Sequence, residues 1–398
     1  MSKGILSGYT ILDLSTVILG PFATQMLGDM GADVIKVETP QGDIMRHAGP
    51  MTAEAMGPIY LTINRNKRSV VLDLKKQEAR DILTRLVAKS DVLLHNIRAG
   101  GMKRLGFDYD SVRKIRPDIV YVHAVGFGSG GPYAGRQAYD DLVQAASGVA
   151  SMLPMQDGSE APRYFPTLIA DKTAGLYAAN ATLAALLHRE RTGEGQFVEV
   201  PMMECVVAFN MAENLYGRAF VPPQGEPGYS RVLSPFRKPY ATQDGYVAIM
   251  PYSDENWRDF FEIGGRPELA SDERFSTYAA RTANISEVYS VAEEIAATKP
   301  TAEWMELLTK ARVPVMRVHT LDSVLDDPQM RETGFVEERD HPAAGRYVAI
   351  HNPLSFSAME RQVTHEPPAL GEHTGEVLRE LGMSEEEISA ARNNGALG

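Results

Sequence analysis

The sequence from Thr10 to Val37 decides the fold class, with TILDL at Thr10–Leu14, FATQMLGDM at Phe22–Met30 and DVIKV at Asp33–Val37. The outer two pieces are short apolar runs of the kind that form buried strands. The middle piece has apolar residues at helical spacing and is followed by Gly31, a residue that often ends helices. A strand, a helix and a strand in this order predict parallel strands in one sheet.

The same alternation continues through the first half of the chain. Further strands are expected at Ser69–Asp73, Asp91–Asn96, Ile119–Val125 and Gln196–Val200, and further helices at Lys76–Ala88, Asp110–Ile115 and Thr173–Arg191. Alternating strands and amphipathic helices predict an α/β fold, in which a mostly parallel sheet is covered by helices on both faces.

The composition changes at Val221–Pro239, a segment rich in proline that predicts a linker or long loop. Beyond it, a strand at Gly245–Met250 and helices at Glu255–Ile263 and Ile285–Ala297 predict a smaller α+β domain that ends near Leu325. The tail has strand-like pieces and a final helix expected at Thr374–Leu381. We therefore expect a large domain over 1–220, a small domain over 221–325, and a C-terminal part over 326–398.

The composition excludes several classes of protein. A net charge of −12 argues against non-specific binding of nucleic acid, which attracts a basic surface. The N-terminus lacks the apolar core of a secretion signal, and no apolar run reaches the roughly 20 residues that span a bilayer. The single cysteine, Cys205, rules out an intramolecular disulfide and fits a reducing compartment. These features predict a cytoplasmic protein that binds neither membranes nor nucleic acid.

Two clusters of positive charge stand out from the acidic background. The first contains Arg65, Lys67, Arg68, Lys75 and Lys76, and the second contains Arg98, Lys103 and Arg104. A solvated basic face is the simplest interpretation of such clusters. A binding site for a small anionic ligand is the alternative.

The glycine-rich stretch Gly126–Gly131 matches G-x-G-x-x-G and directly follows a predicted strand. A dinucleotide site also needs a helix that opens at the glycine turn, but Pro132 and Gly135 follow here. A glycine loop near some other ligand is therefore favoured over a nicotinamide site. The nine histidines show no H-x-H or H-x-x-x-H pair, so no metal site is expected.

Asp171 precedes a long apolar helix and allows two interpretations. It could be an ordinary N-cap residue, which needs no catalytic role, and spacing alone favours this interpretation. It could also be a nucleophile, because the helix dipole and Lys172 would keep the carboxylate ionised beside small residues.

Several short segments, taken in order, carry a resemblance to a known family. They are Leu12-Asp13-Leu14 through Gly20-Pro21-Phe22, Gly31–Glu38, Asn64–Ser69, Leu72–Lys75, Ala170-Asp171, Thr192–Gln196 and Leu370–Thr374. In these segments the chain resembles the class III CoA-transferases, such as formyl-CoA transferase, carnitine CoA-transferase and succinyl-CoA:glutarate CoA-transferase, nearly from end to end.

The resemblance implies a doubly wound large domain made from both chain ends, a small domain between them, and an interlocked homodimer. It implies that Asp171 attacks an acyl-CoA, and that CoA passes through an aspartyl anhydride and an aspartyl-CoA thioester to a small carboxylic acid. Oxyanions would be stabilised by amides of Gly126–Gly131 or of the loop before Tyr229. The implied CoA contacts are Ile18, Leu19, Leu72, Asp73, Leu74, Lys75, Asn96, Ile97, Arg98, Arg104, Gln137, Ala138, Tyr139 and Asp140.

The chain departs from the family pattern at two positions. Thr39 stands where many relatives have an adenine-stacking arginine, so adenine is expected to rest on Arg104, alone or with Arg98. Ile18 stands where formyl-CoA transferase has glutamine, which weakens a prediction of formyl-CoA or oxalate specificity.

Three other functions are weighed against CoA transfer. An α-methylacyl-CoA racemase shares the fold but needs a second acid–base group, and Tyr139 stands at or beside the position of its histidine. A nicotinamide-dependent oxidoreductase and a non-catalytic CoA-binding scaffold are the remaining alternatives. If the transferase uses succinyl-CoA and a dicarboxylate acceptor, Arg46 or Arg231 is expected to pair with the distal carboxylate.

Overall fold

The structure is a computed structural model that describes residues 4–361 and 363–397. The chain forms two compact units. The larger unit contains Met1–Ser147, Phe165–Phe209 and Gln329–Gly398, so it is built from both ends of the chain. The smaller unit contains Gly148–Tyr164 and Asn210–Pro328, and thus begins earlier than the predicted range 221–325 and takes in an additional short segment.

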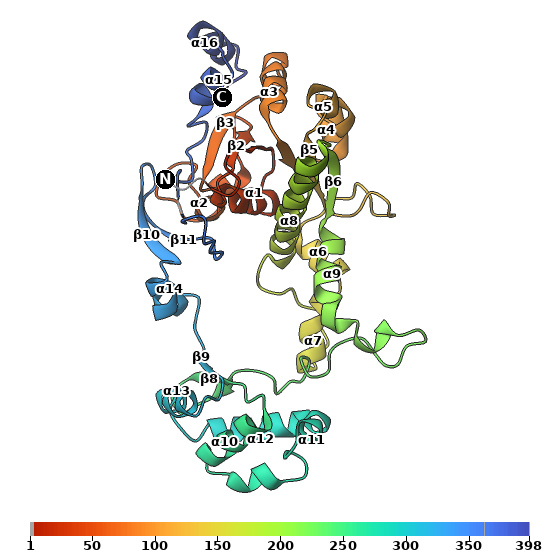
Figure 1. Ribbon diagram of the computed structural model, residues 1–398, viewed down its shortest axis with the longest axis vertical. Coiled ribbons are helices and arrows are strands. Elements are labelled where there is room, and N and C mark those ends of the chain that lie inside the picture. Colours follow the sequence, from red (N-terminus) through yellow and green to blue (C-terminus); the bar gives the residue numbers. More distant parts are fainter. Residues whose placement is uncertain (1–3, 362, 398) are drawn as a thin grey trace. The chain divides into compact units, whose positions relative to one another are not determined.

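The larger unit is organised around a six-stranded sheet. Its strands are β1 (Thr10–Asp13), β2 (Asp33–Glu38), β3 (Lys67–Val71), β4 (Val92–His95), β5 (Val120–Val125) and β6 (Gln196–Pro201). They lie in the order β3-β2-β1-β4-β5-β6, and every neighbouring pair is parallel (Figure 1). The predicted parallel sheet is confirmed. The chain leaves β1 in one direction and β4 in the other, so the sheet has a switch point between these two strands.

Helices cover both faces of this sheet, as predicted. The helices of the larger unit are α1 (Leu19–Asp29), α2 (Pro58–Ile63), α3 (Gln77–Lys89), α4 (Ala99–Leu105), α5 (Tyr109–Ile115), α6 (Asp140–Ala146), α8 (Ile169–Thr192), α15 (Thr374–Glu380) and α16 (Glu385–Asn393). Leu12 faces a core shared with α3, α5, α15 and α16. The next residue, Asp13, faces the other side of the sheet and bonds to Thr24 of α1. On that side α1 packs against α8.

The C-terminal segment returns to the larger unit. It forms an antiparallel hairpin of β10 (Val336–His341) and β11 (Gly345–Ile350) before α15 and α16. The prediction that Thr374–Leu381 is the final helix is wrong, because α16 follows it. The sequence carries a signal for α16: Ser384 and Glu387 form a capping box, in which each side chain accepts a backbone N–H of the other residue.

The smaller unit is an α+β structure with a core of its own. Its antiparallel sheet contains β7 (Tyr240–Ala241), β8 (Tyr246–Ile249) and β9 (Val315–Arg317). Its helices are α7 (Met152–Asp157), α10 (Asp254–Ile263), α11 (Tyr278–Ala283), α12 (Ile285–Ala296) and α13 (Thr301–Lys310). Trp257, Phe260 and Trp304 form the centre of its core. The chain passes between the units after Ser147, after Tyr164, within α9 (Met202–Asn214) and within α14 (Pro328–Glu332).

Candidate active site

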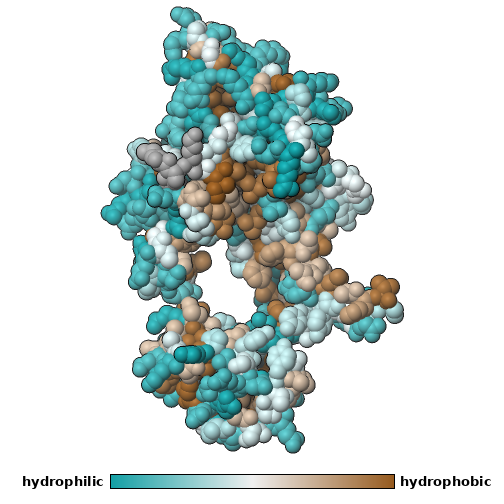
Figure 2. Space-filling view, viewed as in Figure 1, coloured by the Kyte–Doolittle hydropathy of each residue, from teal (hydrophilic) through white to brown (hydrophobic). Residues whose placement is uncertain are grey.

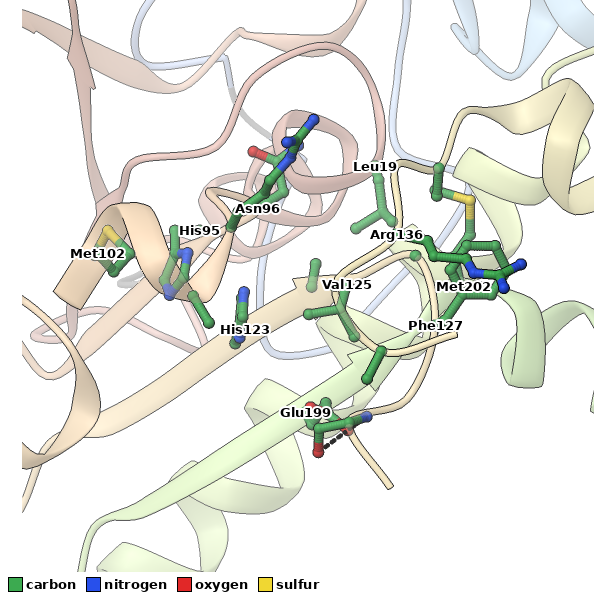
Figure 3. A pocket seen from close by; sticks show the side chains of 18 of the residues that line it. Leu19, His95, Asn96, Met102, His123, Val125, Phe127, Arg136, Glu199 and Met202 are labelled. Atoms are coloured by element: carbon green, nitrogen blue, oxygen red, sulfur yellow. Dashed lines mark hydrogen bonds between the residues drawn. The ribbon is translucent and has the colours of Figure 1, made fainter. Parts of the chain in front are cut away.

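A pocket of about 560 Å³ opens at the carboxyl ends of the central strands of the larger unit (Figure 3). Its walls come from the segments that follow β1, β4, β5 and β6, together with the start of α8. Open parallel sheets bind ligands at such a position because the loops on either side of the switch point diverge there. The pocket therefore lies where the topology alone would place a binding site.

Asp171 lines this pocket, but it does not cap α8. The helix begins at Ile169, which puts Asp171 in the first turn. The free amides of that turn are instead bound by Asp140 of α6, whose carboxylate accepts the N–H groups of Ala170 at 2.8 Å and Asp171 at 3.0 Å. The N-cap interpretation of Asp171 is thus wrong, and its carboxylate is left available to the pocket.

The environment of Asp171 raises the pKa of its carboxyl group to about 6. Burial is the largest cause, and the negative charge of Asp140 adds to it, whereas a backbone hydrogen bond from Leu19 acts in the opposite direction. Lys172 does not have the predicted effect, because its ammonium bonds to the Thr167 hydroxyl at 2.5 Å. Asp171 is therefore a more basic carboxylate than an ordinary aspartate, yet it is mostly ionised at neutral pH.

The segment between β1 and α1 forms the wall beside Asp171 and is held in a strained conformation. Val17 has a φ of 72°, in the left-handed region that β-branched residues rarely occupy. The Asp43 carboxylate accepts the Val17 N–H at 3.2 Å, and the fully buried Lys36 bridges Asp43 and the Ser15 carbonyl. A buried ion pair thus fixes the segment that ends at Leu19 in the pocket.

The structure brings together about half of the predicted CoA contacts in one pocket. The residues that line it are Leu19, Asn96, Arg98, Gln137, Ala138, Tyr139 and Asp140. The remaining residues, Ile18, Leu72, Asp73, Leu74, Lys75, Ile97 and Arg104, are not part of its lining. Leu72–Lys75 follows the end of β3 and so lies at the same edge of the sheet as the pocket, and Arg104 is exposed in the last turn of α4.

The first basic cluster is not a solvated face. Lys67 pairs with Asp13, Arg65 with Asp29 and Arg68 with Asp33. All three cations are buried. These ion pairs hold β3 and the residues before it against neighbouring elements. Of the five cations in the cluster, only Lys75 and Lys76, which follow β3, are exposed.

Arg46 cannot serve as the predicted partner of a substrate carboxylate. Its side chain is fully buried, and its guanidinium binds both oxygens of Glu38, at 2.8 and 2.6 Å, as well as the Pro368 carbonyl. A side chain in this position has a structural role. Arg231, the other candidate, lies in the smaller unit and bonds to the Tyr289 hydroxyl at 3.2 Å.

The glycine loop after β5 differs from a dinucleotide-binding turn, as predicted from Pro132. No helix begins between Val125 and Asp140 in this fully described stretch. The N–H of Gly128 donates to Glu204 and that of Ser129 to Glu199, so these two amides are not available to an oxyanion. Gly126 has a packing role, since a Cβ there would lie 2.0 Å from the Ala138 Cβ.

The sequence analysis missed several polar residues of the pocket, above all His95, His123 and Arg136. His95 and His123 are stacked with their ring centroids 4.3 Å apart. They are register partners on β4 and β5. A search for closely spaced histidines could not find them, because strand pairing rather than sequence spacing brings them together. Arg136 directly precedes Gln137, a predicted CoA contact, and this position was the only indication in the sequence that Arg136 lies in the pocket.

The comparisons with known proteins decide the family. A sequence profile of CoA-transferase family III matches residues 6–374. The chain belongs to this family.

Relatives and solved structures of the family agree over almost the whole chain. Formyl-CoA:oxalate CoA-transferase of Escherichia coli O6:H1 is 31% identical and aligns with 98% of this chain and 99% of its own length. A CaiB/BaiF family protein from Brucella suis is 30% identical, with a TM-score of 0.82 over 95% of this chain and 100% of its own. Rv3272 from Mycobacterium tuberculosis is 31% identical, with a TM-score of 0.81 over 94% and 99%.

This member of CoA-transferase family III is a CoA-transferase, and enzymes of the family act on CoA thioesters and carboxylic acids. Within the described residues, no cluster of three or more histidine, cysteine, aspartate or glutamate side chains is arranged to hold a metal ion. Among the helices in the described parts of the chain, none combines the length and the apolar character needed to cross a bilayer.

Proposed function

We propose that the enzyme transfers CoA between carboxylic acids through covalent intermediates on Asp171. The observation that carries this proposal is the Asp171 carboxylate, which lines the pocket and whose pKa is raised to about 6. Such a group is ionised at neutral pH and is a better nucleophile than an ordinary aspartate, because nucleophilicity follows basicity among similar oxygen anions.

In the first half of the proposed reaction, a carboxylate oxygen of Asp171 attacks the thioester carbonyl of the donor. The C–S bond breaks, which gives a mixed anhydride and CoA thiolate. The thiolate then attacks the Asp171 carbonyl carbon, and the anhydride C–O bond breaks to release the donor carboxylate. The product on the enzyme is an aspartyl-CoA thioester.

The second half runs in the reverse sense with the acceptor acid. The acceptor carboxylate attacks the aspartyl thioester and expels the thiolate, which gives a second anhydride. The thiolate attacks the acceptor's carbonyl carbon, so that the new acyl-CoA forms and the Asp171 carboxylate is regenerated. No net proton transfer is needed, which fits a site whose central group is a carboxylate.

CoA would bind along the carboxyl edge of the sheet. Arg98 and Arg136 line the pocket and could hold the phosphates, since a guanidinium pairs well with phosphate oxygens. Leu72–Lys75 lies at the same edge, and this segment and the exposed Arg104 would contact the adenosine end. Asn96 also bonds to Thr16 in both directions, at 2.8 and 3.1 Å, and so links the proposed CoA site to the strained wall beside Asp171.

Two pairs of substrates are candidates for this enzyme. The relatives named formyl-CoA:oxalate CoA-transferase make formyl-CoA and oxalate one candidate pair. Ile18 argues against this pair, because the family resemblance implies a glutamine at this position in formyl-CoA transferase. We propose succinyl-CoA as donor and a small dicarboxylate as acceptor, with Arg231 as the remaining candidate for the distal carboxylate. Arg231→Ala should then raise the KM for the dicarboxylate acceptor, and a KM equal to that of the wild type would end this part of the proposal.

A homodimer is the proposed assembly. α8 exposes Leu176, Tyr177 and Leu187, each between 41% and 52% exposed, and Figure 2 shows hydrophobic surface on the larger unit in this region. Exposed apolar side chains on a protein with a well-packed core indicate a binding partner. We propose that the partner is a second copy of this chain, because the family resemblance implies an interlocked homodimer. Light scattering after gel filtration would test this, and a monomer at micromolar concentration would contradict it.

The experiment that tests the covalent mechanism is intact-mass spectrometry. Wild-type protein is incubated with succinyl-CoA and then treated with hydroxylamine or borohydride, which convert an acylated carboxylate into a stable derivative. We expect an adduct on Asp171 in the wild type and none in Asp171→Ala. Asp141→Ala, which removes an exposed carboxylate on α6, is the matched control and should form the adduct normally.

The outcomes separate the alternatives. An adduct at Asp171 with succinyl-CoA supports CoA transfer through this residue. If several acyl-CoAs give no adduct, but the enzyme exchanges the α-proton of an acyl-CoA in deuterated water, the covalent mechanism is wrong and the racemase reaction replaces it.

A further inference from the structure

The N-terminal turn of α1 packs closely against α8, the helix that carries Asp171. Gly175 of α8 is buried and faces this turn: a Cβ at Gly175 would lie 2.9 Å from the Leu19 carbonyl oxygen and 3.0 Å from the Phe22 ring. Residues four apart on a helix lie on the same face, so Gly175 lies one turn beyond Asp171 on one face of α8. The close contact with Leu19 is therefore on the side of α8 that carries the proposed nucleophile.

A second glycine closes the other side of the same turn. A Cβ at Gly20 would lie 2.2 Å from the side chain of the buried Ser15, whose hydroxyl and backbone N–H both donate to Asp13. The buried ammonium of Lys67 also donates to the Pro21 carbonyl at 2.9 Å. The first turn of α1 is thus enclosed by backbone and buried polar groups, so that one added methyl group would displace it.

The Leu19 N–H is directed at the Asp171 carboxylate. Leu19 is the first residue of α1, so its N–H has no acceptor within the helix. It donates a hydrogen bond to Asp171, and this bond lowers the pKa of the carboxyl group, against the effect of burial. Both residues line the pocket, and Figure 3 shows the Leu19 side chain there. The backbone of α1 thus holds one oxygen of the carboxylate.

Other amides near the pocket that could bind an oxyanion already have acceptors. The N–H groups of Gly128 and Ser129 donate to Glu204 and Glu199. The amides at the start of α8 donate to Asp140. The Leu19 N–H differs from these because its acceptor is the reacting group itself.

The proposed reaction needs a donor at this place. When the CoA thiolate or the acceptor carboxylate attacks the carboxyl carbon of acylated Asp171, the C=O oxygen takes up the electron pair and becomes an oxyanion. When the tetrahedral intermediate collapses, the pair returns to the C=O bond, and the C–O bond of the anhydride or the C–S bond of the thioester breaks. A backbone N–H that is already in place at this oxygen stabilises the developing charge.

We propose that the Leu19 N–H is the oxyanion donor for attack at the Asp171 carboxyl carbon, and that Gly175 is a positioning residue that lets Leu19 approach closely enough to donate. The oxygen held by Leu19 remains the carbonyl or oxyanion oxygen throughout, and the other oxygen attacks the donor thioester. This inference rests on the proposed covalent mechanism and deepens it. It concerns the steps at the Asp171 carbon and leaves the binding of CoA unchanged.

The first test compares Gly175→Ala with the matched substitution Gly28→Ala. Gly28 lies near the other end of α1, where a Cβ would lie 3.0 Å from the Asn66 carbonyl oxygen. Both variants therefore add a methyl group against a backbone oxygen at a contact of α1, but only one of them does so beside Leu19.

The reaction to be measured is a single attack at the Asp171 carbon. Each enzyme is incubated with succinyl-CoA, the proposed donor, until the aspartyl-CoA thioester has formed, and the rate at which hydroxylamine cleaves this thioester is followed by intact-mass spectrometry. We expect the rate to fall at least about tenfold in Gly175→Ala and to stay unchanged in Gly28→Ala. The dissociation constant for free CoA should be the same in all three proteins.

The acid limb of the pH profile separates positioning from a general loss of packing. Loss of the Leu19 hydrogen bond removes an effect that lowers the pKa of Asp171, while burial and the charge of Asp140, which raise it, remain. The acid limb of kcat/KM should therefore move to higher pH in Gly175→Ala. A packing defect alone would lower kcat without moving the limb.

Removal of the N–H itself tests the donor without an added side chain. Nonsense suppression at Leu19 with the α-hydroxy acid that corresponds to leucine replaces the N–H by an ester oxygen and keeps the side chain. We expect cleavage by hydroxylamine to slow by roughly a hundredfold, the usual effect of losing one oxyanion donor, and the acid limb to move to higher pH. The same replacement at Asp254, the first residue of α10, is the control and should change neither.

Two results would overturn the inference. One is a wild-type rate of thioester cleavage in the ester variant at Leu19. The other is an equal loss of rate in Gly175→Ala and Gly28→Ala with an unmoved acid limb, which would mean that the effect comes from helix packing alone. Wild-type protein that forms no adduct on Asp171 with any acyl-CoA would instead refute the covalent mechanism, so the two failures are distinguishable.

Discussion

The carboxylate of Asp140 caps the helix that carries Asp171, and does so through the backbone N–H of Asp171 itself, at 3.0 Å. One side chain thereby orients the first turn of α8 and places a negative charge beside the proposed nucleophile. Gln144 fixes the other oxygen of Asp140 at 2.6 Å. The two aspartates have separate tasks, since Asp140 is saturated with hydrogen bonds and Asp171 is directed to the pocket.

The pH dependence of the reaction should follow the ionisation of Asp171. With a pKa of about 6, kcat/KM should fall below pH 6 and reach about a tenth of its plateau at pH 5. Asp140→Asn removes a charge that raises this pKa, so the acid limb should move to lower pH. Steady-state kinetics from pH 4.5 to 8 measure the shift, and an unmoved limb in the variant would contradict the assignment.

The raised pKa of Asp171 also predicts how stability depends on pH. Since the folded-state pKa of about 6 lies above the ordinary 3.8, the folded protein binds this proton more tightly than the unfolded chain does. Stability from this group is therefore present below about pH 4 and is lost as the pH rises through 6.

Asp171→Asn should consequently be more stable than the wild type at pH 7. The gain should be of the order of 1–3 kcal/mol in the free energy of unfolding, and should vanish near pH 4. Urea denaturation at both pH values measures it. The exposed Asp141→Asn provides the control and should change stability little at either pH; a gain for Asp171→Asn that is equal at pH 4 and pH 7 would show that its origin is not the ionisation.

The strained segment at Val17 predicts a positioning role for Asp43. Asp43→Asn weakens both its ion pair with Lys36 and its hold on the Val17 N–H, so that Val17 can relax from its φ of 72°. We expect kcat to fall at least tenfold while KM for the donor changes little, since a small misplacement near the nucleophile has a large effect on rate.

Asp29→Asn is the matched control for this variant. Asp29 also takes part in a buried ion pair, with Arg65 at 2.6 Å, but it does not line the pocket. Both substitutions should destabilise the protein by about 1–4 kcal/mol. Only Asp43→Asn should lower kcat. A similar loss of kcat in both variants would mean that Asp43 contributes to stability alone and has no positioning role.

The contact between Gly126 and Ala138 predicts that the loop after β5 tolerates no side chain at its start. In Gly126→Ala the added methyl would lie 2.0 Å from the Ala138 Cβ, so the segment Gln137–Tyr139 must move. We expect the dissociation constant for CoA to rise at least fivefold. Gly130→Ala in the same loop has no neighbour within 4 Å and should bind CoA normally; equal affinities of the two variants would argue against a role of this contact.

Much of the larger unit could be predicted from local pattern. Strands such as Asp33–Glu38 and helices such as Gln77–Lys89 lie within a few residues of their predicted positions, because apolar periodicity and glycine stops are local signals. The capping box of Ser384 and Glu387 is a local sequence signal for α16, but the prediction did not use it and so missed this last helix.

The site was predictable only in part. Asp171 and the loop Gln137–Asp140 came from the resemblance to a family, whereas spacing alone favoured a capping role for Asp171. Arg46 was misassigned because a sequence does not indicate that Glu38 and Pro368, far apart in the chain, enclose its guanidinium. Burial and ion pairing of this kind depend on contacts between distant segments.

The sequence by itself determined the parallel α/β architecture and the place of a ligand pocket, since the order of strands and helices sets the edge at which the loops meet. The tertiary structure alone decided the chemistry of that pocket. It placed Asp140 against the amides of Asp171, Asp43 beneath Val17, and His95 in register with His123. Hydrogen bonds and charges act over a few ångströms in space, and the residues that meet in this way are separated by tens of positions along the chain.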